Sequence, residues 1–353
     1  MKHLMTAVML LFASLAVAQT APTEKKAGRT AESVSYFLPK TALRLNFLIE
    51  KKVFTPGEFC KYAEKYLRLT GIPQEEEVTH SIVRFGWTTI GLRDTSKFYT
   101  VHLAGKTLNA DIRLSDDGVL QAINAEPSVV KLPEPFKPAP KPTPINPRHY
   151  LSAEVLAAGS LAKMAELTVM QIIGLQEHRQ QLITGEAEDT PTDKEELQLM
   201  LDQIDKEREI LMSMFLGTTT RDTTEQVMIV CPEKEVQKEV LFRLNKKTGI
   251  VDKDDLSGIP YYMTVEDLHR ATNQPYDVAE AKKDGGFWVN EPGKIKFTLY
   301  REDHLLGGTE LYAPQFGYVQ LRSGSLFKRY TTHMVLSPIF GNVERIQADM
   351  GGK

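Results

Sequence analysis

Hydrophobic and polar residues alternate in several short stretches of this chain. The alternation is clear over residues 43–47, 240–244 and 295–299, where apolar side chains occupy every second position. Successive side chains of a strand point to opposite faces, so this period predicts strands with one buried face. Three more strands are expected near 78–86, 97–103 and 109–123.

A short helical segment is predicted after the first of these strands. The stretch Thr55-Pro56-Gly57-Glu58 combines an N-cap residue, a proline at the first helical position and an acidic third position. Apolar residues from Phe59 to Leu67 then share one helix face. Gly71 and Pro73 follow, and both are typical of a helix end.

Two longer helical stretches follow between residues 149 and 216, with apolar residues at alternating steps of three and four. These heptad seams predict an antiparallel coiled-coil hairpin over 148–217. Arg179 and Arg208 fall on the seams and are expected at their edges, with packed stems. The seams comprise Leu161, Ala165, Thr168, Ile172, Leu175, Arg179 and Leu182, and Leu197, Leu201, Ile204, Arg208, Leu211 and Phe215.

Prolines at positions 133, 135, 138, 140, 142, 144 and 147 mark the clearest boundary in the chain. Each proline lacks a backbone donor and fixes φ, so an extended polyproline II segment is expected. A spacer is favoured over a docking ligand for a partner. The expected organisation is a disordered N-terminus 19–30, an N-terminal α+β domain 31–132, a Pro-rich linker 133–147, the helical hairpin 148–217 and a C-terminal β domain 224–348.

The first 18 residues have the three parts of a cleaved secretory signal peptide. Lys2 and His3 form a basic start, residues 4–15 are almost wholly apolar, and Ala16-Val17-Ala18 places small residues at a cleavage site. This apolar run is shorter than the roughly 20 residues that span a bilayer. A buried N-terminal helix is the less favoured alternative.

The composition is that of a folded protein, with 42% hydrophobic and 25% charged residues. No later segment has a long uncharged apolar run, so no transmembrane segment is expected after signal cleavage. Lys2 is the only charged residue in 1–18, so its removal changes the net charge from −3 to −4. So balanced a charge does not indicate nucleic acid or an anionic membrane as a partner.

The chain has two cysteines, Cys60 and Cys231, too few for a disulfide scaffold or for a zinc site of their own. In an oxidising compartment they could form a disulfide, which would contribute about 4–5 kcal/mol in the chain-entropy model. Two separate buried thiols are an equal alternative.

Two sequence matches to known active-site or metal-binding motifs are incomplete. Ser160-Leu161-Ala162-Lys163 and Lys247-Thr248-Gly249 match two motifs of penicillin-binding enzymes, but the third motif is missing and the second lies in an expected turn. Asp252, Asp254 and Asp255 suggest calcium, yet the later loop positions lack the required ligands. We therefore expect no catalytic residue, no metal ligand and no cofactor.

Several stretches resemble an uncharacterised family of exported proteins of the Bacteroidota, catalogued as a domain of unknown function. The resemblance spans nearly all the chain after the signal peptide. It implies a Gram-negative envelope, either the periplasm or the outer membrane, and no mechanism. At the position after Leu67 this chain has Arg68, where the family pattern has a small residue. The sequence therefore does not fix the residue at which this helix ends. The stretches are Tyr36-Phe37-Leu38-Pro39-Lys40-Thr41, Gly57-Glu58-Phe59, Tyr62-Ala63, Tyr66-Leu67, Thr184-Gly185-Glu186-Ala187-Glu188, 199–205 and Phe215-Leu216-Gly217-Thr218.

The expected fold class is α+β, with two β-rich lobes, an inserted helical hairpin and a Pro-rich linker. The favoured function is a non-catalytic envelope scaffold or accessory subunit that binds another envelope protein through the hairpin. A glycan-binding module is one alternative, since exposed aromatic rings stack on sugars, although core packing is the commoner role of such rings. An unrecognised envelope hydrolase is the other. The candidate glycan contacts are Tyr261, Tyr262, Trp288 and Tyr312.

Overall fold

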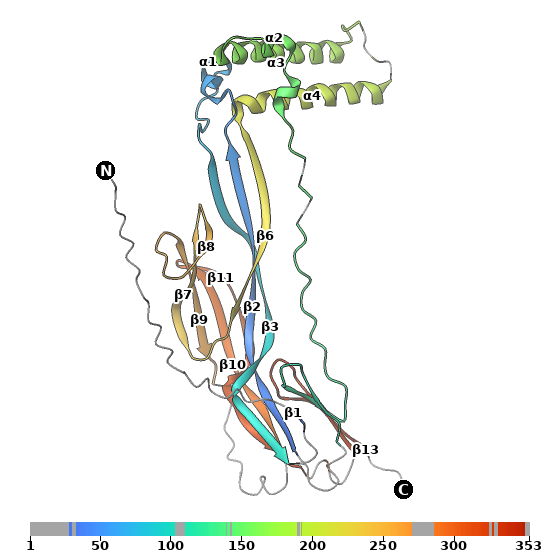
Figure 1. Ribbon diagram of the computed structural model, residues 1–353, viewed down its shortest axis with the longest axis vertical. Helices are drawn as coiled ribbons and strands as arrows, with labels where there is room; N and C mark the ends of the chain where they lie inside the picture. Colours follow the sequence, from blue (N-terminus) through green and yellow to red (C-terminus); the bar gives the residue numbers. More distant parts are fainter. Residues whose placement is uncertain are drawn as a thin grey trace, which may run out of the picture.

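The computed structural model describes residues 28–29, 33–102, 110–138, 140–141, 143–188, 191, 193–269, 286–324, 327 and 331–349. The predicted signal peptide, residues 1–18, lies outside these residues. Figure 1 shows an elongated molecule with its helices gathered at one end. We call the helical end the head, the long strands β2, β3 and β6 that run from it the stalk, and the β-rich opposite end the base.

The described strands form three antiparallel sheets. The stalk sheet contains β1 (Gly28–Arg29), β2 (Ser33–Thr55), β3 (Glu77–His102) and β6 (Thr218–Val230), with β2 between β3 and β6. The second sheet has the order β11-β10-β9-β7-β8, and the third has the order β13-β12-β5-β4. Their strands are β4 (Ile112–Leu114), β5 (Leu120–Ile123), β7 (Val236–Asn245), β8 (Gly249–Val251), β9 (Ile259–Asp267), β10 (Phe287–Arg301), β11 (His304–Arg322), β12 (Thr331–Leu336) and β13 (Val343–Asp349).

The stalk is built on one unusually long hairpin. β2 has 23 residues and pairs with β3 from Ser33↔His102 to Phe54↔Glu77. At about 3.3 Å per residue, such a strand spans roughly 75 Å. β6 pairs with the other edge of β2 from Leu43 to Thr55, so the half of the stalk nearer the head has three strands.

The alternation predicted over residues 43–47 is confirmed, because Leu43, Leu45 and Phe47 are buried while Arg44 and Asn46 are more exposed. The buried side chains form one core cluster with residues of β7, β9, β10 and β11. The second sheet therefore packs against one face of the stalk. The stretches predicted at 240–244 and 295–299 lie in β7 and β10, which belong to that sheet.

The predicted separation into an N-terminal domain 31–132 and a C-terminal domain 224–348 does not describe the tertiary structure. β2 of the first segment pairs with β6, which leads into the second, and β5 pairs with β12. A further core cluster also joins the two segments, since it combines Val34 and Leu120 with Phe287 and Met334. Strands distant in sequence thus complete one another's sheets. The coarser prediction, an α+β protein rich in strands, is confirmed.

Three predicted strand boundaries differ from the structure. Residues 78–86 and 97–102 belong to one strand, β3, which bulges where Phe37↔Phe98 is followed by Leu38↔Asp94, while residues 103 and 109 of the predicted segments lie outside the described residues. The bulge accommodates three extra residues, so β3 continues past it. The segment 109–123 instead divides into β4 and β5, because Gly118, with φ +77°, closes a turn between them. Residues 28–29, within the stretch predicted to be disordered, pair with β2 as β1.

The helix predicted after Thr55 begins later than expected. β2 continues through Thr55 and a 3₁₀ turn, η1 (Cys60–Tyr62), precedes α1 (Ala63–Leu67). The helix stops at Arg68, whose φ of 59° is left-handed, so the stop lies before Gly71. The other head elements are η3 (Pro147–Tyr150), α2 (Ala153–Leu156), α3 (Leu161–Thr184) and α4 (Lys194–Leu216).

The head has a core of its own, to which α1, α2, α3 and α4 all contribute. Phe59 and Phe215 are fully buried there, with ring centroids 5.3 Å apart. Ser160 caps α3 by accepting a hydrogen bond from the backbone of Lys163, and Asp193 caps α4 in the same way from Glu195. Figure 1 shows α3 and α4 side by side and crosswise to the stalk. The heptad supercoil proposed for this hairpin stays a prediction.

Residues 126–146 connect the base to the head, and we call this segment the strap. Its described residues are neither helix nor strand. Figure 1 shows it running alongside the stalk from the base sheet to the head. Ser128 donates to Glu344 of β13 at the base end, and Arg148, just past the head end, forms an ion pair with Glu58.

Gly57 fits against α4 at the junction of head and stalk. A Cβ added there would lie 2.2 Å from the carbonyl oxygen of Met214, so the main chain would have to move. We expect Gly57→Ala to lower the free energy of unfolding, measured by urea denaturation, by about 1–3 kcal/mol. Gly174 of α3 is the control, because a Cβ there meets no atom within 4 Å. Gly174→Ala should raise the same quantity by about 0.5–1 kcal/mol, and equal effects would contradict the close contact.

Candidate functional site

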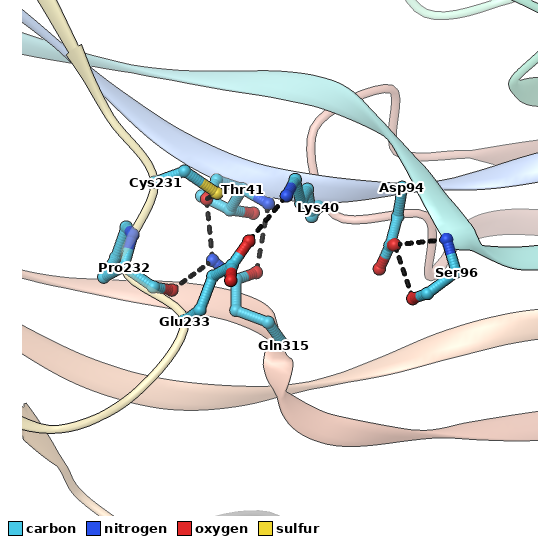
Figure 2. Close-up of polar contacts among 8 residues, drawn as sticks. All are labelled: Lys40, Thr41, Asp94, Ser96, Cys231, Pro232, Glu233 and Gln315. Carbon is cyan, nitrogen blue, oxygen red and sulfur yellow. Dashed lines mark hydrogen bonds and ion pairs between the residues drawn. The ribbon is translucent and has the colours of Figure 1, made fainter. Parts of the chain in front are cut away.

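A group of polar side chains that could take part in binding or catalysis lies where the stalk meets the base (Figure 2). Two belong to β2, two to the bulge of β3, three to the connection from β6 to β7, and one to β11. We call this group the polar joint. Its members are Lys40, Thr41, Asp94, Ser96, Cys231, Pro232, Glu233 and Gln315.

Gln315 is the centre of this joint. Its side-chain nitrogen donates to the carbonyl oxygens of Thr41, at 2.7 Å, and of Pro232, at 2.8 Å. Its side-chain oxygen accepts from the backbone nitrogen of Thr41 at 3.1 Å. One amide therefore ties β11 to β2 and to the end of β6, as Figure 2 shows.

The charged groups of the joint are held in local pairs. Lys40 Nζ lies 2.7 Å from Glu233 Oε1, and this hydrogen bond raises the pKa of Lys40. Asp94 accepts from both the backbone nitrogen and the hydroxyl of Ser96, at 3.0 and 2.6 Å. These contacts order the β2 edge and the β3 bulge.

A second amide continues the joint into the base. Asn290 of β10 is fully buried and donates to the carbonyl oxygens of Pro39 and Phe340, each at 2.8 Å. Its side-chain oxygen accepts from Lys97 Nζ at 3.1 Å, and Lys97 also donates to the carbonyl oxygen of Pro314. Burial lowers the pKa of Lys97, while nearby Asp94 opposes that shift. Asn290 thus fastens the stalk to β10 and to the segment after β12.

The thiol of Cys231 is the group of the joint with the greatest nucleophilic potential. It is half-buried and lies 3.5 Å from the carbonyl oxygen of Thr41. Burial raises the pKa of Cys231 by more than the nearby Lys40 lowers it, so the protonated thiol is favoured. A catalytic cysteine instead needs a lowered pKa and an adjacent base, and none of the eight joint residues is a histidine. The arrangement supports a structural connection.

The disulfide considered for Cys60 and Cys231 is not formed, because both thiols are free. Cys60 lies in η1 of the head, whereas Cys231 follows β6 at the base end of the stalk. The 13 residues of β6 run between these two regions. A disulfide allows about 7 Å at most between its Cα atoms, so the pair is beyond reach.

The motifs considered in the sequence lie at helix caps and turns. Ser160 is the N-cap of α3, and Lys163 forms an ion pair with Glu166 one turn later. Lys247 and Thr248 occupy the turn from β7 to β8, where Asn245 accepts from both of their backbone nitrogens. Asp252 and Asp255 likewise accept from backbone nitrogens two residues on. Among the described residues, no group of three or more His, Cys, Asp or Glu side chains is arranged to hold a metal ion.

The four aromatic residues considered as glycan contacts do not share one surface. Tyr261 is buried and stacks on Phe242 at 4.6 Å, and Tyr262 follows it on the opposite face of β9. Trp288 is half-buried against a different core cluster, where it stacks on Tyr99. Only Tyr312 of the four is exposed, and its ring meets Phe340 edge-on. The geometry therefore gives this set no common binding platform.

The hairpin presents a second candidate surface, at the opposite end of the molecule. Residues 160–216 contain twelve Asp or Glu and five Lys or Arg, a net charge of −7 within a chain of −3. Met170 and Ile173, one turn apart on α3, are 61% and 48% exposed. Leu199 of α4 is 70% exposed. This surface combines negative charge with exposed apolar groups, as many protein contact surfaces do.

The seam arginines have the surroundings expected for the edge of the hairpin. Arg179 Nε donates to both carboxylate oxygens of Asp205, at 2.9 and 3.0 Å, and so links α3 to α4. Arg208 lies 3.8 Å from the same carboxylate. Both arginine side chains are a little over one third exposed. The hairpin is thus joined by charge as well as by apolar packing.

Comparison with known proteins identifies the family of the chain. The family model described as a domain of unknown function, DUF4831, matches residues 32–344. The chain belongs to the DUF4831 family. The matched region of this DUF4831 chain includes head, stalk and strap and all but the last residues of the base. No curated protein and no solved structure matches it. In the described part of the DUF4831 chain, every helix is too short or too polar to cross a membrane.

Sequence reasoning had no signal for the central amide of the joint or for the second amide that continues the joint into the base. Asn290 follows three apolar residues of β10, Gln315 lies between Pro314 and Phe316 of β11, and most of their partners are main-chain groups far away in sequence. A polar residue inside an apolar strand pattern is the one available hint. By contrast, the heptad pattern already left Met170 and Ile173 outside the seam, so their exposure follows from it.

Proposed function

We propose that this DUF4831 chain is a non-catalytic protein of a cell envelope, acting as a scaffold or accessory subunit through protein–protein contacts. The main support is the architecture. An acidic head with exposed apolar side chains lies at one end of a long stalk, and the β-rich sheets pack along the rest of that stalk. Such a spacing serves to present one surface at a distance from another.

The proposal places the chain in the periplasm or at the outer membrane of a Gram-negative cell. The support is the signal peptide expected in residues 1–18, together with the family resemblance. The polar joint adds to the argument for a scaffold, because its amides and charges bind main-chain groups and one another. Those contacts stiffen the connection between stalk and base.

The chemistry of the head suggests the kind of partner. A net charge of −7 over residues 160–216, together with exposed Met170 and Ile173, fits a partner surface that has both basic groups and an apolar patch. Apolar side chains at the centre of such a contact contribute most of the affinity, and the surrounding charges steer association.

Substitution of the exposed head residues tests this proposal. The full chain, tagged and purified from detergent-solubilised envelopes of its native cells, should retain a defined partner. Met170→Lys combined with Ile173→Lys should reduce the amount of that partner by about tenfold or more, because it removes the apolar contact and adds two positive charges to an acidic surface that faces a basic partner. Quantitative mass spectrometry of the purified material is the measurement.

Leu256→Lys is the matched control, because Leu256 is 80% exposed but lies in a turn between β8 and β9. Helical circular dichroism should be unchanged in all variants. Point variants are preferable to deletion of 160–212, since that deletion would uncover buried Phe59 and Ala63. A wild-type chain that purifies without a partner, or a partner that survives the head substitutions, would count against the proposal.

A further inference from the structure

β6 is an edge strand of the stalk sheet, and its outer edge pairs with no described strand. Among the strands that the structure describes, β2 is its sole pairing partner, so the backbone groups on its other side have no strand beside them. The second half of β6, residues 226–230, contains no charge and no proline. Val227 and Ile229 there are 41% and 55% exposed. An edge of this kind is a template for pairing with another chain.

The strap lies against this edge. Lys141 Nζ is 2.7 Å from Asp222 Oδ2, and the backbone nitrogen of Phe136 donates to Glu225 Oε2 at 3.0 Å. Residues 222 and 225 are three apart in a strand, so their side chains project from opposite faces. A segment that contacts both faces follows the edge between them, and Figure 1 shows the strap beside β6.

The composition of the strap makes it a cover and not a further strand. Seven residues of the strap are prolines, which lack the backbone donors that a ladder of hydrogen bonds needs. Its described contacts with β6 go to the side chains of Asp222 and Glu225. The side chains of Lys141 and Asp222 are 71% and 38% exposed, and ion pairs this exposed are weak. The cover is therefore held loosely enough to be displaced.

We propose that the strap is a removable cover for β6, and that the uncovered edge pairs antiparallel with β6 of a second copy of this chain. Pairing centred on Thr223 places Arg221 of each copy opposite Glu225 of the other, and Asp222 opposite Thr224. Directly opposed charges of opposite sign favour strand pairing, and this register opposes no like charges. The two three-stranded stalks then form one continuous sheet. This inference does not depend on the proposed partner of the head.

Charge exchange between strap and edge tests the cover. Lys141→Asp and Asp222→Lys each replace the ion pair with two like charges, which should release the strap. Each single variant should form dimers at a concentration about two- to fivefold lower than the wild type, as expected for an exposed pair. The double variant restores the pair with its charges exchanged and should return to the wild-type mass distribution. Light scattering during size-exclusion chromatography over a concentration series measures this.

The control is Lys238→Asp, which breaks the comparably exposed Lys238–Asp303 pair away from the strap and should leave the mass unchanged. Hydrogen exchange of the dimers should show slower exchange in residues 218–230 and faster exchange in residues 133–147. Single variants that keep the wild-type mass would overturn the proposal. So would a double variant that dimerises like the single variants, or dimers without protection in β6.

Discussion

Phe47→Ala is expected to lower the free energy of unfolding by about 3–5 kcal/mol, as measured by urea denaturation followed by fluorescence. Phe47 lies on the buried face of β2 and is 1% exposed. Its ring meets that of Phe242 edge-on, with centroids 4.9 Å apart and planes at 68°. The substitution leaves a cavity between the stalk and the second sheet, where neither side can close it without moving a long strand.

The control for this prediction is Leu256→Ala. Leu256 is 80% exposed, so its truncation should change the free energy of unfolding by no more than about 0.5 kcal/mol. A Phe47→Ala protein as stable as this control would show that the second sheet does not pack on the stalk as described. The comparison thus tests the central packing of the molecule.

Asn290→Leu is expected to have an effect of similar size, about 3–5 kcal/mol. The leucine has the same branched shape but removes the donors to Pro39 and Phe340 and the acceptor from Lys97. The carbonyl oxygens of Pro39 and Phe340 then lose their donor in the interior, and the ammonium group of Lys97 loses one of its acceptors. Because Asn290 is fully buried, water cannot replace the lost hydrogen bonds without opening the structure.

Gln176→Leu provides the matched exchange at an exposed position of α3 and should stay within about 0.5 kcal/mol of the wild type. Asn290→Asp is a useful second variant. It keeps an acceptor for Lys97 but loses both donations to carbonyl oxygens, so it should also be destabilised. Native stability of either Asn290 variant would mean that this amide does not fasten stalk and base together.

These two predictions concern different means of joining distant segments. Phe47 joins stalk and base by apolar packing, whereas Asn290 joins them by hydrogen bonds to main-chain groups. Both contacts link residues more than 190 positions apart in sequence. A long stalk has little core of its own, so its attachment to the base depends on such contacts. A scaffold that holds its head at a fixed distance requires this rigidity.

Much of the secondary structure could be predicted because its signals are local. The alternation at Leu43, Leu45 and Phe47 reports one buried face regardless of what covers it. The heptad steps through Ile172 and Leu211 likewise locate two helices, and both residues are buried in the head core. The helix after Thr55 was misplaced because β2 continues through its expected start. Pairing with β3 and β6 there outweighs the local preference for a helix cap.

The candidate site was predicted less completely. The turn expected at Lys247 is confirmed, and Ser160 caps a helix. The joint around Gln315 was not predicted, because its three partners are backbone groups of Thr41 and Pro232. Every residue has a backbone carbonyl group, so the residue types in the sequence do not predict which of these groups a distant side chain will bind.

The sequence by itself determined the approximate positions of most strands and of the two long helices, where the Pro-rich strap interrupts them, and that an acidic hairpin lies in the middle of the chain. Periodicity, capping and the missing donor of proline act over a few residues, and so they can be read locally. Only the tertiary structure decided that β6 completes the sheet of β2, that β5 pairs with β12, and that Cys60 and Cys231 lie far apart. These features depend on which distant segments bury one another's surfaces, and that choice follows from the packing of the whole chain.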